Sequence, residues 1–314
     1  MLSTLLVTLT LAVIWKGKAA AECPCMYLEA DPLFPGTTGY RWDCEYVVHG
    51  LTEVPSACWA EHPHATQVFL DYNNIEAVPR AGFVGLDDLR TLSLKHNAIT
   101  AIDEEALTGL SSLEFLDLSA NKLKSPPSQV WQLTGLTHLY LGDNSFTDAE
   151  TFTISNLVNL EVLDLHLNHL REIPHDSLQP LTKLRKVHLY WNMLVNLPNL
   201  TENVMMEELL VNGNALLKFP KYMFGNLTSP LTYHFVDNPA YDVWATMLLP
   251  LPDRSHIVMG FDVSVWAEDE QQAQELIQKD WLVQDGLSQT LDLASLVKIC
   301  GRTSKQQQTR LPPC

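Results

Sequence analysis

Hydrophobic residues recur along most of the chain at one fixed spacing. The clearest copy is LRTLSLKHNAI, residues 89–99, with leucine or isoleucine at positions one, four, six and eleven and asparagine at position nine. Copies of this pattern, LxxLxLxxNxL, begin at Ala65, Leu89, Leu113, Leu136, Leu160, Leu184 and Met206. They start 24, 24, 23, 24, 24 and 22 residues apart, so the sequence predicts a solenoid of about seven or eight stacked units.

Positions three to seven of each copy alternate polar and apolar residues, which is the period of a strand with one buried face. Parallel stacking of these strands would bury positions four and six in one continuous core, because each unit covers the next. The predicted core comprises Val68, Leu70, Leu92, Leu94, Leu116, Leu118, Leu139, Leu141, Leu163, Leu165, Val187, Leu189, Leu209 and Val211.

Asparagine at position nine is equally regular. The residues are Asn73, Asn97, Asn121, Asn144, Asn168, Asn192 and Asn214. An asparagine side chain both donates and accepts, so a column of them can satisfy backbone groups at an internal turn. Leaving such a group unpaired costs about 1–3 kcal/mol, which indicates a structural role for these residues.

The second half of most units contains prolines, which limit helical growth and predict short turns and partial helices there. After Leu231 the pattern weakens. The segment LTYHFVDNPAY, residues 231–241, fits a last strand in either of two registers. Further on, we expect a strand over 257–265 and helices over 268–284 and 291–299, which together would cover the open end of the solenoid.

The repeats resemble those of secreted leucine-rich-repeat proteins with a cysteine-rich N-terminal cap. GLTEVPS at 50–56 and Cys44 match the end of such a cap, and the resemblance covers about Cys44 to Pro239. It implies an α/β solenoid with short parallel strands on its concave face, a disulfide-bonded N-terminal cap and a small α/β C-terminal cap. The expected boundaries are 1–21 for a signal peptide, 22–64 for the N-terminal cap, 65–239 for the solenoid, and 240–314 for the C-terminal cap and tail.

Six cysteines lie towards the two ends of the chain: Cys23, Cys25, Cys44, Cys58, Cys300 and Cys314. An even number in an oxidising compartment indicates disulfides. The first four cysteines allow three pairings, and Cys314 is able to bond either Cys300 or another chain. Zinc is disfavoured, because the Cys-x-Cys pair has no second close pair beside it.

The first residues indicate secretion. The apolar run over 2–15 is shorter than the roughly 20 residues of a membrane span, and Ala19-x-Ala21 provides the small residues of a cleavage site. A signal peptide is therefore favoured over an uncleaved anchor, and no other segment is apolar enough to span a membrane. Asn199 and Asn226 begin glycosylation sequons.

The charge and the motifs of the chain restrict the classes of function to be expected. The net charge is −17, and loss of Lys16 and Lys18 with the signal peptide would bring it to about −19. Such a surface repels nucleic acid. The chain lacks a phosphate-binding glycine loop, a GxSxG elbow and an HExxH motif, so we expect neither an enzyme nor a cofactor.

One metal hypothesis remains. His138, His166 and His188 fall on neighbouring strands, near the carboxylates of Asp117, Asp143 and Asp164. Converging imidazole and carboxylate groups bind metals. The spacing follows from the repeat, however, and histidines also fall on variable positions by chance. We therefore expect no metal.

The concave face carries the candidate binding site, because strand positions two, three, five, seven and eight point away from the core. Its larger residues are Phe69, Tyr72, His96, Phe115, His138, Tyr140, His166, His188, Tyr190, Trp191 and Leu210. Acidic residues stand around them, including Asp71, Asp117 and Asp164. Aromatic residues with a polar rim are typical of protein interfaces, although they also fill the inside of a curved sheet.

The sequence thus predicts a non-enzymatic extracellular protein that holds a protein partner on its concave face. The alternative comes from a narrower resemblance. A secreted, acidic chain with such repeats and an unusual C-terminal cap also looks like the non-catalytic subunit of a decapod luciferase. That resemblance implies a structural subunit of a secreted hetero-complex with an enzyme.

Overall fold

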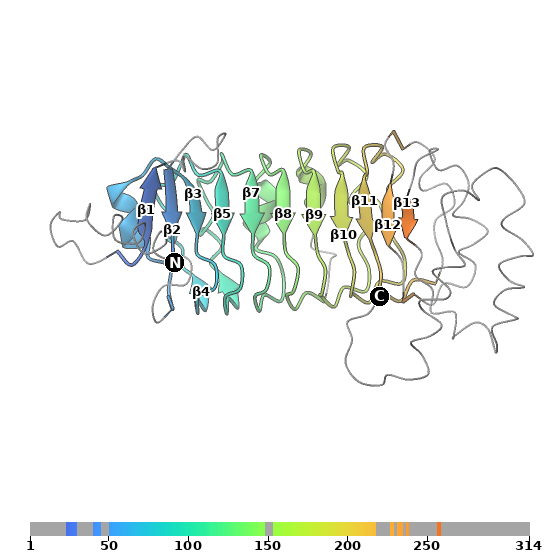
Figure 1. The fold of residues 1–314 in the computed structure, drawn as a ribbon, viewed down its shortest axis with the longest axis horizontal. Coiled ribbons are helices and arrows are strands. Elements are labelled where there is room, and N and C mark those ends of the chain that lie inside the picture. The colour runs from blue at the N-terminus through green and yellow to red at the C-terminus, as the bar shows by residue number, and fades with distance from the viewer. Residues whose placement is uncertain are drawn as a thin grey trace, which may run out of the picture.

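The computed structural model describes residues 23–29, 40–44, 50–147, 153–217, 227–228, 231–234, 237–238 and 256–258. Their strands form one sheet of eleven, ordered β1-β2-β3-β5-β7-β8-β9-β10-β11-β12-β13. Figure 1 shows these strands side by side in a single row along the long axis. Because the strands follow chain order, each unit pairs with the units before and after it, which confirms the predicted solenoid.

The strands are short and occupy equivalent positions in successive units. Their bounds are β1 (Met26–Glu29), β2 (Tyr40–Asp43), β3 (Ala65–Phe69), β5 (Thr91–Ser93), β7 (Phe115–Asp117), β8 (His138–Tyr140), β9 (Val162–Asp164), β10 (Lys186–His188), β11 (Glu208–Leu210), β12 (Thr232–His234) and β13 (His256–Val258). β1 and β2 are antiparallel, and all the other neighbours in this sheet are parallel.

Equivalent residues face each other across the sheet, as Leu92 and Leu116 do. This register lines up positions four and six of every unit on the inner side of the sheet. All of the predicted core residues are at most 1% exposed, so the predicted core is confirmed. Alternation alone was sufficient here, because a shift of one residue would have moved every leucine to the solvent side.

The asparagine column joins each unit to the one before it. Asn168 Nδ2 donates to the carbonyl oxygens of Leu141 and Leu165, both at 3.1 Å. Its Oδ1 accepts from the amide of Phe146 at 3.0 Å. All seven predicted asparagines make this set of bonds, which confirms their structural role.

Asn238 extends the column by one unit. Its Nδ2 donates to the Val211 carbonyl at 2.9 Å, and its Oδ1 accepts from the Leu216 amide at 3.2 Å. These contacts settle the register for the described residues of this segment, 231–234 and 237–238, placing Asn238 at position nine and β12 opposite β11. β13 then pairs in parallel with β12, within the part of the chain assigned to the C-terminal cap. The boundary at residue 239 stays a prediction.

The second halves of the units are irregular, as expected. In the described ranges the helical elements are 3-10 helices: η1 (Ser56–Glu61), η2 (Ser128–Gln132) and η3 (Ile154–Asn156). A two-stranded sheet, β4 (Ala77–Val78) with β6 (Ala101–Ile102), also lies there. None of the helices among the described residues is long and apolar enough to cross a membrane.

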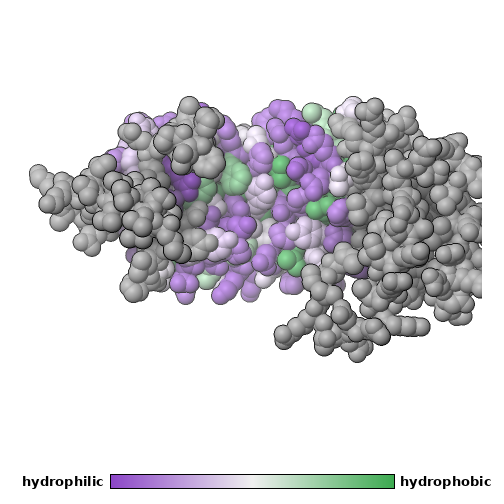
Figure 2. Space-filling model, viewed as in Figure 1, coloured by the Kyte–Doolittle hydropathy of each residue, from purple (hydrophilic) through white to green (hydrophobic). Residues whose placement is uncertain are grey.

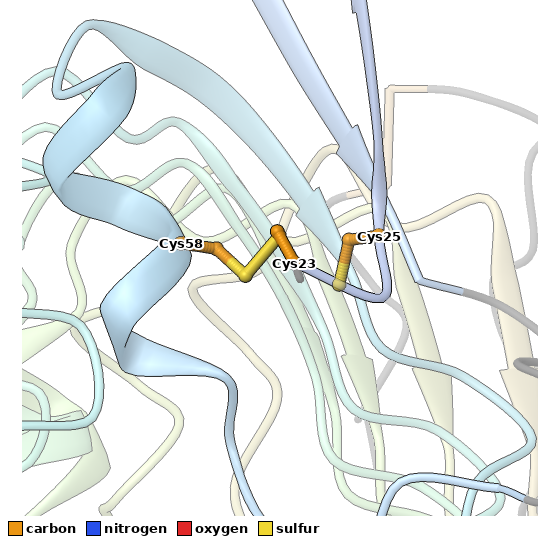
Figure 3. Close-up of side chains that lie close together, drawn as sticks. All are labelled: Cys23, Cys25 and Cys58. Atoms are coloured by element: carbon orange, nitrogen blue, oxygen red, sulfur yellow. A yellow bond between two sulfur atoms is a disulfide. The ribbon is translucent and has the colours of Figure 1, made fainter. Parts of the chain in front are cut away.

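Two disulfides close the N-terminal cap, Cys23–Cys58 and Cys25–Cys44, and they settle the pairing that the sequence left open. Figure 3 shows Cys23 and Cys25 on the segment before β1, with Cys23 reaching Cys58 on η1. The sulfur atoms of Cys23, Cys25 and Cys58 lie within 4.8 Å of one another. All three are in disulfides, so none is a thiolate able to bind zinc.

The cap continues the sheet of the solenoid. The amide of Cys44 donates to the Phe69 carbonyl at 2.8 Å, and its own carbonyl accepts from Asn73. Cys44 therefore takes the place that a position-six leucine has in the repeats. The predictions for residues 1–21, Asn226, Cys300, Cys314 and the two C-terminal helices lie outside the described residues.

Candidate functional site

The outward side of the sheet, predicted to be concave, is called here the sheet face. It consists of positions two, three, five, seven and eight of each unit. Figure 2, viewed as in Figure 1, shows a mostly hydrophilic surface with separate hydrophobic spots. The predicted site residues divide into two groups. Half-buried residues on or next to strands are Phe69, Phe115, His138, Tyr140, His166, His188, Tyr190 and Leu210, and exposed residues are Tyr72, His96 and Trp191.

The exposed group stands at turns instead of on strands. Position eight has a left-handed backbone in each of the seven units, with φ of 57° at Tyr72, 52° at His96 and 55° at Trp191. A bulky residue in this conformation is uncommon, because its Cβ crowds the following carbonyl oxygen. These side chains therefore lie at the edge of the sheet face, just beyond the strand ends.

Asp164 is the centre of the most connected cluster on the face. Its Oδ1 lies 2.5 Å from His166 Nδ1 and accepts from the His166 amide at 3.0 Å. Its Oδ2 lies 3.5 Å from His188 Nδ1. On the other side of that ring, His188 Nε2 is 3.7 Å from Glu208 Oε2. One buried carboxylate thus orients two imidazoles from adjacent units.

The ionisation of this cluster follows from these contacts. Burial acts to raise the pKa of Asp164, but hydrogen bonds from His166 and His188 outweigh it and hold the pKa well below its usual range. Burial acts to lower the pKa of His188, but the hydrogen bond and charge of Asp164, together with Glu208, raise it above its ordinary value. The folded protein therefore favours the protonated form of His188.

Replacing His188 with glutamine is expected to destabilise the protein more in acid than in base. The raised pKa means that the stabilisation from His188 is fully present below the unfolded-state value of 6.5 and is lost as the pH rises through the folded-state pKa. Urea unfolding of the wild type and His188→Gln at about pH 5.5 and about pH 8.5 measures the difference. Equal differences at the two pH values would contradict this coupling. His175→Gln, at an exposed histidine, is the control.

Two glycines leave space for the rings of His166 and Trp191. A Cβ on Gly142 would lie 2.1 Å from His166 Nδ1, and a Cβ on Gly213 would lie 2.6 Å from the Trp191 ring. The His166 ring therefore rests over one glycine and the Trp191 ring over the other. Tyr190 stacks on His166 with ring centroids 4.6 Å apart and planes 18° apart. We call Asp164, His166, His188, Tyr190 and Trp191 the His-Tyr cluster.

Three acids of the sequence-predicted rim are in fact buried in the face. Asp71, Asp117 and Asp164 are 8%, 8% and 7% exposed. Burial is the main reason that the pKa values of Asp71 and Asp117 are raised, although hydrogen bonds from Ser93 and Ser119 oppose it. These acids therefore stand between the aromatic residues of the face and do not surround them.

The histidine column does not assemble the hypothesised metal site. His138 Nδ1 lies 2.9 Å from Thr137 Oγ1, whereas His166 and His188 both point to Asp164. Within the described part of the chain, the one group of three potential ligands within 4.8 Å is the disulfide-bonded cysteine group. The chemistry of the histidines is therefore hydrogen bonding and ring stacking.

Similarity to known proteins agrees with this architecture. Residues 63–123 and 134–194 match the leucine rich repeat family. These segments are leucine-rich repeats. A leucine-rich-repeat protein of Leptospira interrogans is 26% identical, with a TM-score of 0.57 over 67% of this chain and 53% of that one. An internalin of Listeria monocytogenes is 24% identical, with a TM-score of 0.54 over 67% of this chain and 58% of that one.

These likenesses establish the leucine-rich-repeat fold and leave the ligand open. The chain spans little more than half the length of both proteins, and the sequence matches no curated protein. Leucine-rich repeats commonly mediate binding between proteins and are generally non-catalytic scaffolds. Because one fold serves many ligands, the choice of partner has to be argued from residues on the sheet face.

Proposed function

We propose that this chain is a non-enzymatic extracellular protein that holds a protein partner on its sheet face, centred on the His-Tyr cluster. The observation that carries the proposal is the arrangement of Tyr190 and Trp191. Both rings are held in place, by stacking on His166 and by the space over Gly213, and yet Trp191 remains 38% exposed. Ordered aromatic side chains bind with little loss of conformational freedom and are enriched among the residues that dominate interfaces.

The extracellular location is supported by the cap. Cys23–Cys58 and Cys25–Cys44 are disulfides, and such bonds persist in oxidising compartments. The signal-peptide pattern over residues 1–21 agrees with this location.

The sequon at Asn199 also favours the sheet face over the opposite side. Asn199 Oδ1 accepts from the amide and hydroxyl of Thr201, at 3.1 Å and 2.8 Å. It lies in the second half of a repeat, between β10 and β11. A glycan there would be separated from the strands and leave the sheet face open. Glycosylation of Asn199 and Asn226 stays a prediction.

Alanine substitutions test the proposal. Tyr190→Ala and Trp191→Ala are each expected to weaken partner binding by about 2 kcal/mol or more, because each removes a large ring from the centre of the interface. The measurement is calorimetric titration with the partner purified from the native secretion. Val84→Ala is the matched control, since Val84 is 66% exposed in the second half of a repeat.

Unchanged affinity in both aromatic variants would place the partner elsewhere and overturn the proposal. The identity of the captured protein separates the two predicted classes of partner. A secreted enzyme would support the hetero-complex alternative, in which this chain is a luciferase-type structural subunit. A receptor or matrix protein would support a free-standing binding protein.

A further inference from the structure

The middle of the sheet face is acidic and aromatic. The three repeats that begin at residues 113, 136 and 160 have no lysine or arginine at face positions two, three, five, seven and eight. The acids at these positions are Glu114, Asp117, Asp143, Glu161 and Asp164. Glu114 pairs with Arg90 of the preceding repeat, and Asp164 is bonded to the two histidines. Asp117 is the remaining acid that is buried in the face.

Only one of the two carboxylate oxygens of Asp117 accepts hydrogen bonds among the described residues. Its Oδ1 accepts from the amide of Ser119 at 2.8 Å and from the Ser119 hydroxyl at 2.5 Å. Among the described residues its Oδ2 accepts no hydrogen bond, and no lysine or arginine there lies within 4.0 Å of the carboxylate. Lys95 of the preceding repeat acts on Asp117 through its charge alone. A buried carboxylate in this state favours a cationic hydrogen-bond donor.

Two aromatic rings flank this carboxylate. Tyr140 is directly opposite Asp117 in the register of β7 and β8, and Phe115 precedes Asp117 by two residues on the same side of β7. The ring centroids of Phe115 and Tyr140 are 5.3 Å apart, with planes at 41°. Both rings are half-buried, so they present part of their surface on the sheet face.

Strand β2 of the cap and strand β3 of the first repeat show what such an arrangement binds. There Asp43 of β2 is opposite Phe69 of β3, as Asp117 is opposite Tyr140. Arg41 places its Cζ 4.2 Å from the centre of the Phe69 ring, and its Nη2 donates to Asp43 Oδ2 at 2.8 Å. The protein itself thus supplies a guanidinium group to an aspartate and an aromatic ring on the same face.

We propose that Asp117, Phe115 and Tyr140 form a subsite for the guanidinium group of an arginine on the partner. This inference rests on the proposed function and adds the chemistry of the partner surface. Arginine fits better than lysine, because a planar guanidinium stacks on a ring while it donates to a carboxylate. The net charge of −17 also favours a basic partner surface.

Short peptides test the subsite without the native partner. The probes are the capped tripeptides Gly-Arg-Gly, Gly-Lys-Gly and Gly-citrulline-Gly, titrated into the full chain and followed by amide NMR shifts. We expect the arginine peptide to bind about five-fold more tightly than the citrulline peptide, which is nearly isosteric but uncharged, and more tightly than the lysine peptide. The largest shifts are expected at residues 115–119 and 140.

Asp117→Asn is expected to remove this preference, whereas Asp143→Asn should retain it. The two changes remove the same charge, and Asp143 is exposed at position eight of the next repeat. A circular dichroism melt checks that Asp117→Asn folds. Phe115→Leu, on the surface side of β7, provides a second variant and should also weaken arginine binding about five-fold.

Equal affinity for the arginine and citrulline peptides would overturn the subsite, and so would equal losses in Asp117→Asn and Asp143→Asn, which would indicate a general charge effect. The native partner separates this failure from that of the proposed function. If Tyr190→Ala and Trp191→Ala weaken partner binding while Asp117→Asn does not, the subsite alone is wrong. If none of the three affects the partner, the sheet face is not its binding site.

Discussion

Asn168→Ala is expected to lower the free energy of unfolding by about 3–5 kcal/mol. The asparagine is 3% exposed and joins three backbone groups of two adjacent repeats. Alanine would leave the Phe146 amide unpaired, in a place with little access to water. It would also remove one of the two asparagine donors from each of the Leu141 and Leu165 carbonyls, which keep their bonds from Asn144 and Asn192. A buried amide left unpaired costs about 1–3 kcal/mol, and each of the two other lost hydrogen bonds costs about 1 kcal/mol. Urea unfolding followed by circular dichroism measures the change.

Asn159→Ala is the matched control. Asn159 also donates to a backbone carbonyl of the preceding repeat, that of Thr134 at 3.0 Å, but at an exposed site where water replaces the bond. We expect a change within about 0.5 kcal/mol. A loss below about 1 kcal/mol in Asn168→Ala would show that the column is not what holds the turns together.

Removing the disulfide between Cys25 and Cys44 is expected to cost about 3 kcal/mol, with the loss concentrated at the N-terminal end. The bond closes a loop between residues 19 apart, and Cys44 also continues the sheet onto β3. In a solenoid each unit is supported by its neighbours, so an opened cap exposes the first repeat before the others.

Hydrogen exchange of the Cys25→Ala, Cys44→Ala double variant locates this loss. Faster exchange is expected for the amides of Leu70 and Tyr72, which bond to the next repeat, while those of Leu165 and Leu189 change little. Uniform acceleration along the chain would show that the cap stabilises the whole solenoid and not its first units.

Much of the fold was predictable because every repeat has the same pattern of apolar positions and the same asparagine. The apolar alternation fixed which side of each strand is buried, and Leu92, Leu116 and Leu139 follow it. The asparagine at position nine showed where the chain turns inside the protein. The register of β12 against β11 was not predictable, because Tyr233 and Phe235 each fit either side of a strand. The contacts of Asn238 with its neighbouring repeat decide it.

The sequence predicted which surface carries the candidate site. It did not predict the backbone conformation or the burial of the residues within that site. Alternation placed Tyr190 and His188 on the sheet face, but it gave no sign that position eight is left-handed at Trp191. It also assigned Asp117 and Asp164 to a rim, since it cannot distinguish an outward acid from one buried among larger neighbours. Gly142 and Gly213 were the available signals, as two glycines within repeat positions where other units have side chains.

Site-specific photocrosslinking tests the central claim, that the sheet face holds the partner. The measurement places p-benzoylphenylalanine at position 190 or, in a second variant, at position 84, and compares the crosslinked yield with the purified native partner. The proposed function predicts a crosslink from position 190 and background yield from position 84, because Val84 lies in the second half of a repeat. A crosslink from position 84 with background yield from position 190 would contradict it.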